Sequence, residues 1–205
     1  MKQGESAPSV WERSRQMASQ EIHDTAIRLF TTQGYEETTT EQIAREAGVS
    51  QRTLFRYFGS KEDLVCGEQE ALGALLTKTV QEQPAQVSAW DALRTGFGEI
   101  VTANHSMEQA LTISTLVFRT PALRARYEQK RVRWQYDLMP VVRSRLCAAG
   151  RENASADHEA RTVIAVSFAC SDAATGSWIA SQGRDDLVDL YDQALAIART
   201  APMST

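Results

Sequence analysis

Hydrophobic residues recur along this chain at intervals of three and four positions, the repeat of an α-helix with one buried face. No segment shows the strict alternation that marks a half-buried strand. The pattern therefore predicts an all-α protein. The expected helices cover residues 19–33, 39–47, 50–57, 61–82, 88–101, 106–119, 121–149, 157–182 and 184–201. Pro140 lies inside one of them and is expected to bend or break it, because proline removes a helical hydrogen bond.

The most specific stretch runs from residue 39 to residue 64, where two short helices flank a tight turn. Thr39 and Gln42 form a capping-box pattern that starts the first helix, and Gly48 ends that helix. Ser50 caps the second helix, which is too short to be stable without packing. Short helices joined by a glycine-containing turn are the signature of a helix-turn-helix, whose second helix enters the DNA major groove.

The outward face of the second short helix carries side chains that can read DNA bases. At about 100° per residue, Leu54 and Phe58 face the core while Arg52 and Arg56 point away from it. Arginine pairs with guanine as a fork, glutamine pairs with adenine, and apolar groups touch the thymine methyl. The alternative is a helical hairpin with an ordinary charged surface. The expected base readers are Gln51, Arg52, Thr53, Phe55 and Arg56.

The start of the next helix offers a site for a backbone phosphate. Ser60 is placed to cap this helix, and Lys61 stands beside the unpaired N–H groups of its first turn. Glu62 and Asp63 complement the helix dipole, but they would repel a phosphate that came close. The phosphate site is therefore assigned to Ser60 and Lys61.

This segment resembles the DNA-binding domain of TetR-type transcriptional regulators over residues 20–66. The resemblance rests on a hydrophobic-rich first helix, on the runs GYEETTTEQIA, AGVS and TLFRYF, and on a lysine at the head of the next helix. It implies that Thr40, Tyr57 and Lys61 contact phosphates, that the five base readers keep their role, and that the protein is a homodimer. The nature of the effector does not carry over. The expected DNA-binding residues are Thr40, Ser50, Gln51, Arg52, Thr53, Phe55, Arg56, Tyr57, Ser60 and Lys61.

Charge changes this picture only locally. The whole chain of 205 residues carries a formal net charge of −4, so long-range attraction to DNA is weak. Residues 43–61 hold four basic residues and one acidic residue, a net of +3. Binding must therefore depend on a few well-placed phosphate contacts.

Candidate chemistry of other kinds is missing from the sequence. Cys66, Cys147 and Cys170 are scattered without a disulfide framework, and we expect no secretory segment or long apolar span, which fits a cytoplasmic protein. The three histidines show no ligand-like spacing, and no catalytic constellation stands out. The sequence predicts no enzyme activity, metal or cofactor.

The last two expected helices, residues 157–182 and 184–201, are apolar over a broad face. Small residues form a ridge on the first of them and would allow close helix packing. Two such hairpins related by a twofold axis would form a four-helix bundle, so we expect a homodimer through these helices. The alternative is that this face packs only within its own chain. The ridge consists of Ala169, Ala173, Gly176, Ser177 and Ala180.

The second half of the chain also holds a candidate effector site. Aromatic residues cluster there, although any helical core needs such residues. Asp137 and Asp172 stand among apolar neighbours; if buried they need partners, and a ligand is one candidate, while surface exposure is the alternative. The expected ligand-binding residues are Phe97, Phe118, Trp134, Asp137, Phe168 and Asp172.

The expected organisation is a flexible arm over residues 1–18, a helix-turn-helix domain over 19–66 and a larger helical regulatory domain over 67–205. Basic residues of the arm either reach into the minor groove or stay solvated; they are Lys2, Arg13 and Arg15. The helix expected over 61–82 would link the two domains.

Together these features predict a homodimeric repressor that binds a near-palindromic operator and is released by a small, largely apolar effector. The alternatives are a DNA-binding thiol sensor that uses Cys66 or Cys170 and, less favoured, a helical enzyme.

Overall fold

The computed structural model describes residues 10–67, 69–103 and 106–200. Every regular element in these ranges is an α-helix, so the predicted all-α fold is confirmed. The chain divides into two compact units, Met1–Gly67 and Glu68–Thr205. The division lies one residue beyond the boundary that the sequence predicts.

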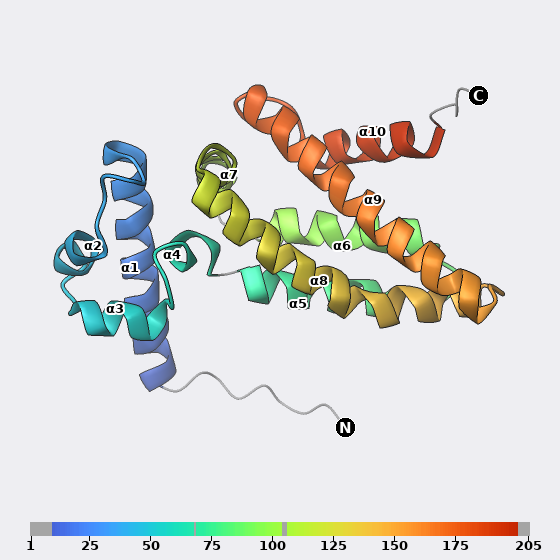
Figure 1. The fold of residues 1–205 in the computed structure, drawn as a ribbon, viewed down its shortest axis with the longest axis horizontal. Coiled ribbons are helices and arrows are strands. Elements are labelled where there is room, and N and C mark those ends of the chain that lie inside the picture. The colour runs from blue at the N-terminus through green and yellow to red at the C-terminus, as the bar shows by residue number, and fades with distance from the viewer. Residues whose placement is uncertain (1–9, 68, 104–105, 201–205) are drawn as a thin grey trace. The chain divides into compact units, whose positions relative to one another are not determined.

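The N-terminal unit is a small bundle built on one long helix. Helix α1 contacts α2 and α4, and α2 contacts α3 (Figure 1). Fully buried apolar side chains, among them Ile22, Leu29, Ile43 and Leu54, join the first three of these helices. The helices are α1 (Val10–Gln33), α2 (Thr40–Glu46), α3 (Gln51–Tyr57) and α4 (Asp63–Cys66).

Helix α1 begins nine residues earlier than expected, at Val10 rather than at residue 19. No glycine or proline interrupts residues 10–33, and Pro8 is the last helix-breaking residue before them. The prediction of a flexible arm is therefore wrong for residues 10–18. Residues 1–9, and with them Lys2, lie outside the described part of the chain.

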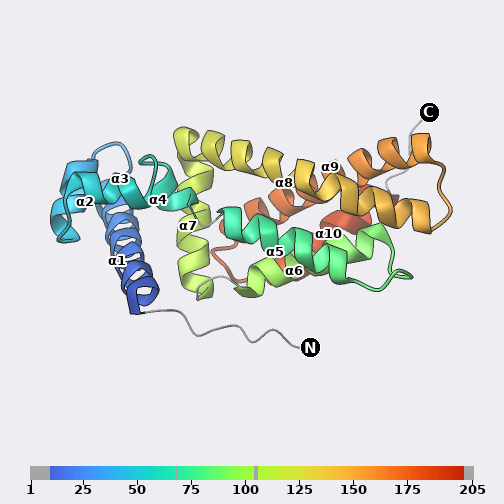
Figure 2. The same cartoon turned by 90° about the horizontal axis from the view of Figure 1, so that it is seen from below.

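The C-terminal unit is a layered helical bundle. Helix α5 packs against α6 and α8, and α9 packs against both α8 and α10 (Figure 2). The helices are α5 (Gln69–Glu82), α6 (Ala89–Ala103), α7 (Met107–Arg119), α8 (Pro121–Ala148), α9 (Asn153–Ala180) and α10 (Leu187–Thr200).

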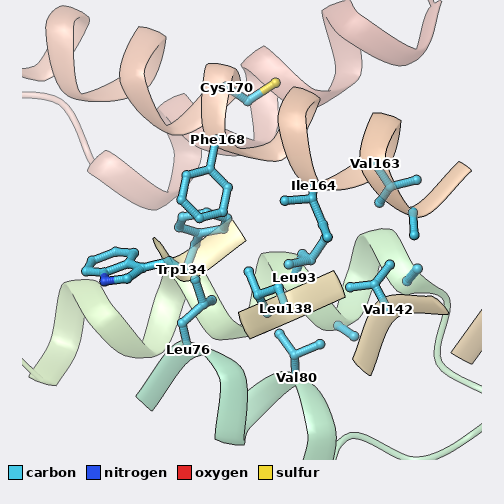
Figure 3. Packing of buried hydrophobic residues seen from close by; sticks show 14 of the residues in the cluster. Leu76, Val80, Leu93, Trp134, Leu138, Val142, Val163, Ile164, Phe168 and Cys170 are labelled. Atoms are coloured by element: carbon cyan, nitrogen blue, oxygen red, sulfur yellow. The ribbon is translucent and has the colours of Figure 1, made fainter. Parts of the chain in front are cut away.

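One apolar core holds this unit together. Leu76 and Val80 of α5, Leu138 and Val142 of α8 and Ile164 of α9 point toward one another (Figure 3). At one end of the core the aromatic rings of Trp134 and Phe168 meet edge to face, with centroids 6.4 Å apart. This end of the core borders the cavity described below.

The helix expected over residues 61–82 is two helices. Helix α4 ends at Cys66 and α5 begins at Gln69, with Gly67 in a turn between them. Glycine is the weakest helix former after proline, which explains a break at this position. The described residues of this stretch therefore belong to two helices, α4 in the first unit and α5 in the second, rather than to the one helix that the sequence predicts.

Helix α8 continues through Pro140 without a break. Leu138 and Val142, on either side of the proline, are fully buried in the core and hold the helix in place. Proline leaves the carbonyl four residues earlier without its helical donor. That carbonyl belongs to Tyr136, an exposed residue, so water can satisfy it.

The ends of the last helices also differ from the expectation. Helix α9 begins at Asn153, so the loop expected over residues 151–156 is much shorter. After α9, Gln182 and Gly183 both adopt positive φ angles, and α10 begins at Leu187 rather than at residue 184. A positive φ ends a helix, and Gly183 tolerates it without strain.

Among the described helices, α9 is long and apolar enough to cross a membrane by length and composition alone, contrary to the expectation of no long apolar span. It packs between α8 and α10, and its buried residues, such as Val163, Ile164 and Trp178, serve the interior of the bundle. The apolar character of α9 is therefore that of a core helix, with a second, small-residue side discussed below.

Candidate DNA interface and effector cavity

Local hydrogen bonds build the helix-turn-helix as its sequence predicts. Thr39 Oγ1 accepts a hydrogen bond from the Gln42 amide at 3.1 Å, which caps α2. Ser50 Oγ accepts one from the Thr53 amide at 3.1 Å, which caps α3. In the turn between them Gly48 has a φ of +66°, a conformation that favours glycine.

Helix α3 turns its polar face to solvent. Leu54 is fully buried and Phe58 nearly so, whereas Arg52 and Arg56 are exposed. The Phe55 side chain between the two arginines is 43% exposed, which is unusual for so large an apolar group. This exposed face is the arrangement required of a helix that reads bases.

The amino-terminal end of α3 is tied to α2 by a polar contact. Gln51 Nε2 donates a hydrogen bond to Thr40 Oγ1 at 3.1 Å. The hydroxyl groups of Ser50 and Thr53 lie 2.8 Å apart and form a second hydrogen bond. A proposed base reader and a proposed phosphate contact are therefore held together before any DNA is bound.

The early start of α1 adds a cation near the same surface. The Arg15 guanidinium carbon lies 5.9 Å from the centroid of the Tyr57 ring, and that of Arg56 lies 5.6 Å from it. Arg15 is exposed. Sequence reasoning assigned Arg15 to an arm, although the uninterrupted run of helix-compatible residues after Pro8 was the signal that could have placed it on α1.

Lys61 has a structural role that the sequence did not reveal. Its Nζ donates a hydrogen bond to the Tyr35 carbonyl at 2.6 Å and lies 4.1 Å from the centroid of the Tyr35 ring. The Tyr35 hydroxyl in turn donates to Glu62 at 2.7 Å. An ammonium group has three N–H donors, so this contact leaves Lys61 able to meet a phosphate as well.

Electrostatics stabilise this small network. Burial opposes ionisation of Glu62, but hydrogen bonds, chiefly from Tyr35, outweigh it and hold the pKa of the carboxyl below its usual value. Burial and the hydrogen bond to Glu62 raise the pKa of Tyr35. Glu62 is therefore charged and Tyr35 neutral at physiological pH.

Ser60 differs from the expectation. Its hydroxyl accepts a hydrogen bond from the Asp63 amide at 3.1 Å and donates one to the Asp63 carboxylate at 3.0 Å. Helix α4 has only four residues. Because Asp63 engages the hydroxyl in both directions, Ser60 has less capacity to bind a phosphate than its sequence position indicated.

The C-terminal unit contains a cavity of about 140 Å³ that is lined by residues of all six of its helices, α5 to α10. Its lining is mostly apolar and includes three of the expected residues, Phe97, Phe118 and Trp134. The expected Phe168 packs behind the lining, with its ring centroid 5.2 Å from that of Phe97. The structure thus brings four of the six expected residues to one place.

The two expected aspartates, Asp172 and Asp137, lie in different surroundings. Asp172 forms an ion pair with Arg131, which lines the cavity. Asp137 does not line the cavity: its side chain is about half exposed and pairs with Arg133, four residues earlier on the same helix. The assignment of Asp137 to the ligand site was therefore wrong, because its apolar neighbours in sequence lie on a different face of α8.

Arg131 is the main cavity residue that sequence reasoning missed. It is only 5% exposed, and its Nη2 donates a hydrogen bond to the Phe168 carbonyl at 2.9 Å. Arg124 also donates a hydrogen bond to Asp172 at 3.0 Å. Its guanidinium group lies over the Phe118 ring. The signal for Arg131 was its position between Tyr127 and Trp134 on the core stripe of α8.

The two cysteines of the thiol-sensor alternative, Cys66 and Cys170, lie in places that suppress their reactivity. Cys66 and Cys170 are both buried, and burial raises the pKa of the Cys170 thiol. The thiolate is the reactive form of cysteine, and redox-sensing cysteines are exposed with a lowered pKa. These observations weigh against the alternative of a thiol sensor.

A helix-turn-helix unit followed by a separate helical unit with its own cavity defines a transcriptional regulator, and not an enzyme. The model of the tetR family of bacterial regulatory proteins matches residues 22–66, and the model of the MftR C-terminal domain matches residues 87–201. The chain belongs to the TetR family of transcriptional regulators.

Individual relatives agree with this assignment. The regulator TcmR from Streptomyces glaucescens is 28% identical over 182 residues, which cover 83% of this chain and 77% of TcmR. The putative mycofactocin biosynthesis regulator MftR from Mycobacterium tuberculosis is 31% identical over 119 residues, 55% of this chain and 58% of MftR. FadR from Bacillus subtilis, solved with stearoyl-CoA, shares the fold with a TM-score of 0.59 at 18% identity, covering 89% of this chain and 98% of FadR.

Proposed function

We propose that this protein is a cytoplasmic homodimeric repressor that binds a near-palindromic operator and leaves it when a small, largely apolar effector occupies the cavity. The observation that carries the proposal is the pairing, within one TetR-family chain, of an exposed base-reading face on α3 with an apolar cavity in the second unit. The proposal has three parts, DNA binding, dimerisation and effector binding, and each has its own support.

The proposed binding of DNA depends on a few contacts with defined roles. Arg52 and Arg56 read bases, with Gln51, Thr53 and Phe55 beside them, as the exposed face of α3 supports. Phosphate contacts come from Thr40, Tyr57 and Lys61, with help from Ser50 and Ser60. Arg15 adds a further cation beside Tyr57.

The proposed dimerisation depends on the exposed side of α9. Ala169, Ala173 and Ser177 are exposed on it, and a Cβ added at Gly176 would meet nothing within 4 Å. This apolar small-residue side lies opposite the buried side of α9 and lacks the charges of an ordinary solvated face. It suits close packing against the same helix of a second chain, with α10 completing a four-helix bundle.

The proposed binding of a small effector depends on the size of the cavity. Its volume of about 140 Å³ is close to that of an engineered cavity that accepts benzene. Typical sites for drug-sized ligands occupy about 300–1,000 Å³. FadR holds stearoyl-CoA; a ligand of that size would require the helices around this cavity to move apart, whereas a single-ring molecule would not.

We expect the Lys61→Ala variant to bind all DNA sequences more weakly and to lose about one unit of the salt slope, because one phosphate contact is removed. The measurement is DNA affinity at several salt concentrations, with circular dichroism to check that loss of the bond to Tyr35 leaves the unit folded. Lys78→Ala, at an exposed lysine of α5, is the matched control. An undiminished slope in Lys61→Ala would show that Lys61 touches no phosphate.

Selection of tight-binding sequences from random DNA tests the proposed function as a whole. The selected sites should be near-palindromes whose half-site centres lie about 34–36 Å, or a multiple of this distance, apart. Each site should bind an even number of chains in analytical ultracentrifugation. Selected sites without symmetry, or one chain on each site, would contradict a twofold-symmetric operator complex.

A further inference from the structure

The lining of the cavity combines one buried cation with several polar side chains. Among the residues that the structure describes, the lining holds one charged side chain, that of Arg131, and no carboxylate. Two further polar groups of the lining are the indole N–H of Trp178 and the hydroxyl of Tyr191. These three groups come from α8, α9 and α10, and the lining also holds the hydroxyl-bearing side chains of Ser114, Tyr127, Ser171 and Thr175.

The positive charge at Arg131 is only partly neutralised. Asp172 is its carboxylate partner, but the same carboxylate also accepts a hydrogen bond from Arg124. Arg124 has a second partner in Glu128, whose side chain is 57% exposed, so solvent screens most of the effect of that charge. Two guanidinium groups thus share one carboxylate beside the cavity, which leaves an excess of positive charge.

One buried donor of the lining lacks a hydrogen-bond partner. Trp178 is 1% exposed, yet its Nε1 makes no hydrogen bond. The buried Tyr191 hydroxyl lies beside the Ser167 hydroxyl, and a hydrogen bond between them opposes the rise that burial causes in the pKa of Tyr191. An indole N–H can only donate, so a partner for Trp178 must supply an acceptor. Buried donors without acceptors are rare in native proteins and call for an explanation.

We infer that the effector is a small apolar anion with acceptor oxygens, of the class of single-ring carboxylates, rather than a cation or a hydrocarbon. The inference rests on the proposed function, since it names the ligand class of the same cavity. A carboxylate would interact favourably with Arg131, and an acceptor oxygen would satisfy the Trp178 N–H. A cation would meet uncompensated positive charge, and a hydrocarbon would leave the Trp178 N–H unsatisfied.

Three probes of nearly the same size test the charge preference directly. At neutral pH benzoate is an anion, benzamide is neutral and benzamidine is a cation. Their affinities for the full-length wild-type protein would be measured by NMR titration. We expect benzoate to bind at least about tenfold more tightly than benzamidine, the scale of one charge-assisted hydrogen bond. Equal affinities, tighter binding of benzamidine, or no binding of any probe would overturn the inference.

Variants connect the preference to the named residues. Arg131→Gln should abolish the preference for benzoate over benzamide, whereas Arg131→Lys, which keeps the charge, should retain much of it. Arg133→Gln, on the exposed side of α8, is the matched control and should leave the affinities for all three probes unchanged. A benzoate preference that survives in Arg131→Gln would also overturn the assignment.

Operator binding separates this inference from the proposed function. If benzoate is preferred but no ligand of the cavity changes operator affinity, the ligand class stands and the proposed regulation fails. If a cationic or neutral compound occupies the cavity and releases the operator while benzoate does not bind, the proposed function stands and the inference fails.

Discussion

Replacing Arg52 or Arg56 with alanine should weaken operator binding by about 1–3 kcal/mol in each case and relax base preference at the contacted positions. The reason is geometric. Both guanidinium groups lie on the exposed face of α3, opposite the buried Leu54, where they can form paired hydrogen bonds with guanine. Fluorescence anisotropy on a selected operator and on single-base variants of it would measure both effects.

A control from the same unit is Arg28→Ala. Arg28 is also exposed, but it lies on α1 and pairs with Glu46 at 2.7 Å. Its loss should leave base preference unchanged. If both α3 variants kept wild-type affinity and wild-type sequence preference, α3 would not be the helix that reads bases.

The second large effect concerns the dimer. Ala173→Arg should convert the protein to a monomer and, as a consequence, abolish tight operator binding. The substitution places a long charged side chain on the small-residue side of α9, where burying it without a partner in the interface is costly. Sedimentation velocity at micromolar concentration would measure the association state.

Ala125→Arg provides a matched control on an exposed position of α8, outside the proposed interface. This variant should remain a dimer and bind the operator. An Ala173→Arg protein that still dimerises, or a wild-type protein that sediments as a monomer, would exclude α9 as the centre of the interface.

The helix-turn-helix was predictable because its signals are local. Thr39 and Ser50 each cap a helix through a hydrogen bond to an amide three residues away, so the sequence alone fixes both starts. The outward face of α3 follows from helical periodicity in the same way. The flexible arm was wrong because polar composition was taken as a sign of disorder, although residues 10–18 contain no helix-breaking residue.

The cavity was only partly predictable because its polar groups depend on contacts between distant segments. Arg131 and Asp172 are 41 residues apart, and nothing in the local sequence pairs them. Arg131 is buried because α9 supplies a carboxylate and a backbone carbonyl to its guanidinium group. Asp137 shows the opposite error, since its apolar neighbours in sequence gave no information about its own exposed face.

The break between α4 and α5 changes how regulation should be described. A single rigid helix from Lys61 to Glu82 would have transmitted a tilt directly, but the structure has two helices there. The energetic requirement is independent of the path. An effector shifts the DNA-binding equilibrium only by its difference in affinity for the two states, typically about 1–3 kcal/mol.

Reciprocity of this coupling provides a decisive test of whether a ligand releases this protein from DNA. A compound that stabilises the protein against heat would be titrated by calorimetry into the protein alone and into its operator complex. We expect weaker binding to the complex, by the same factor by which the compound weakens operator binding. Equal affinity for both forms, found for every stabilising compound while operator binding stays intact, would contradict the claim that this protein is released from DNA by a ligand.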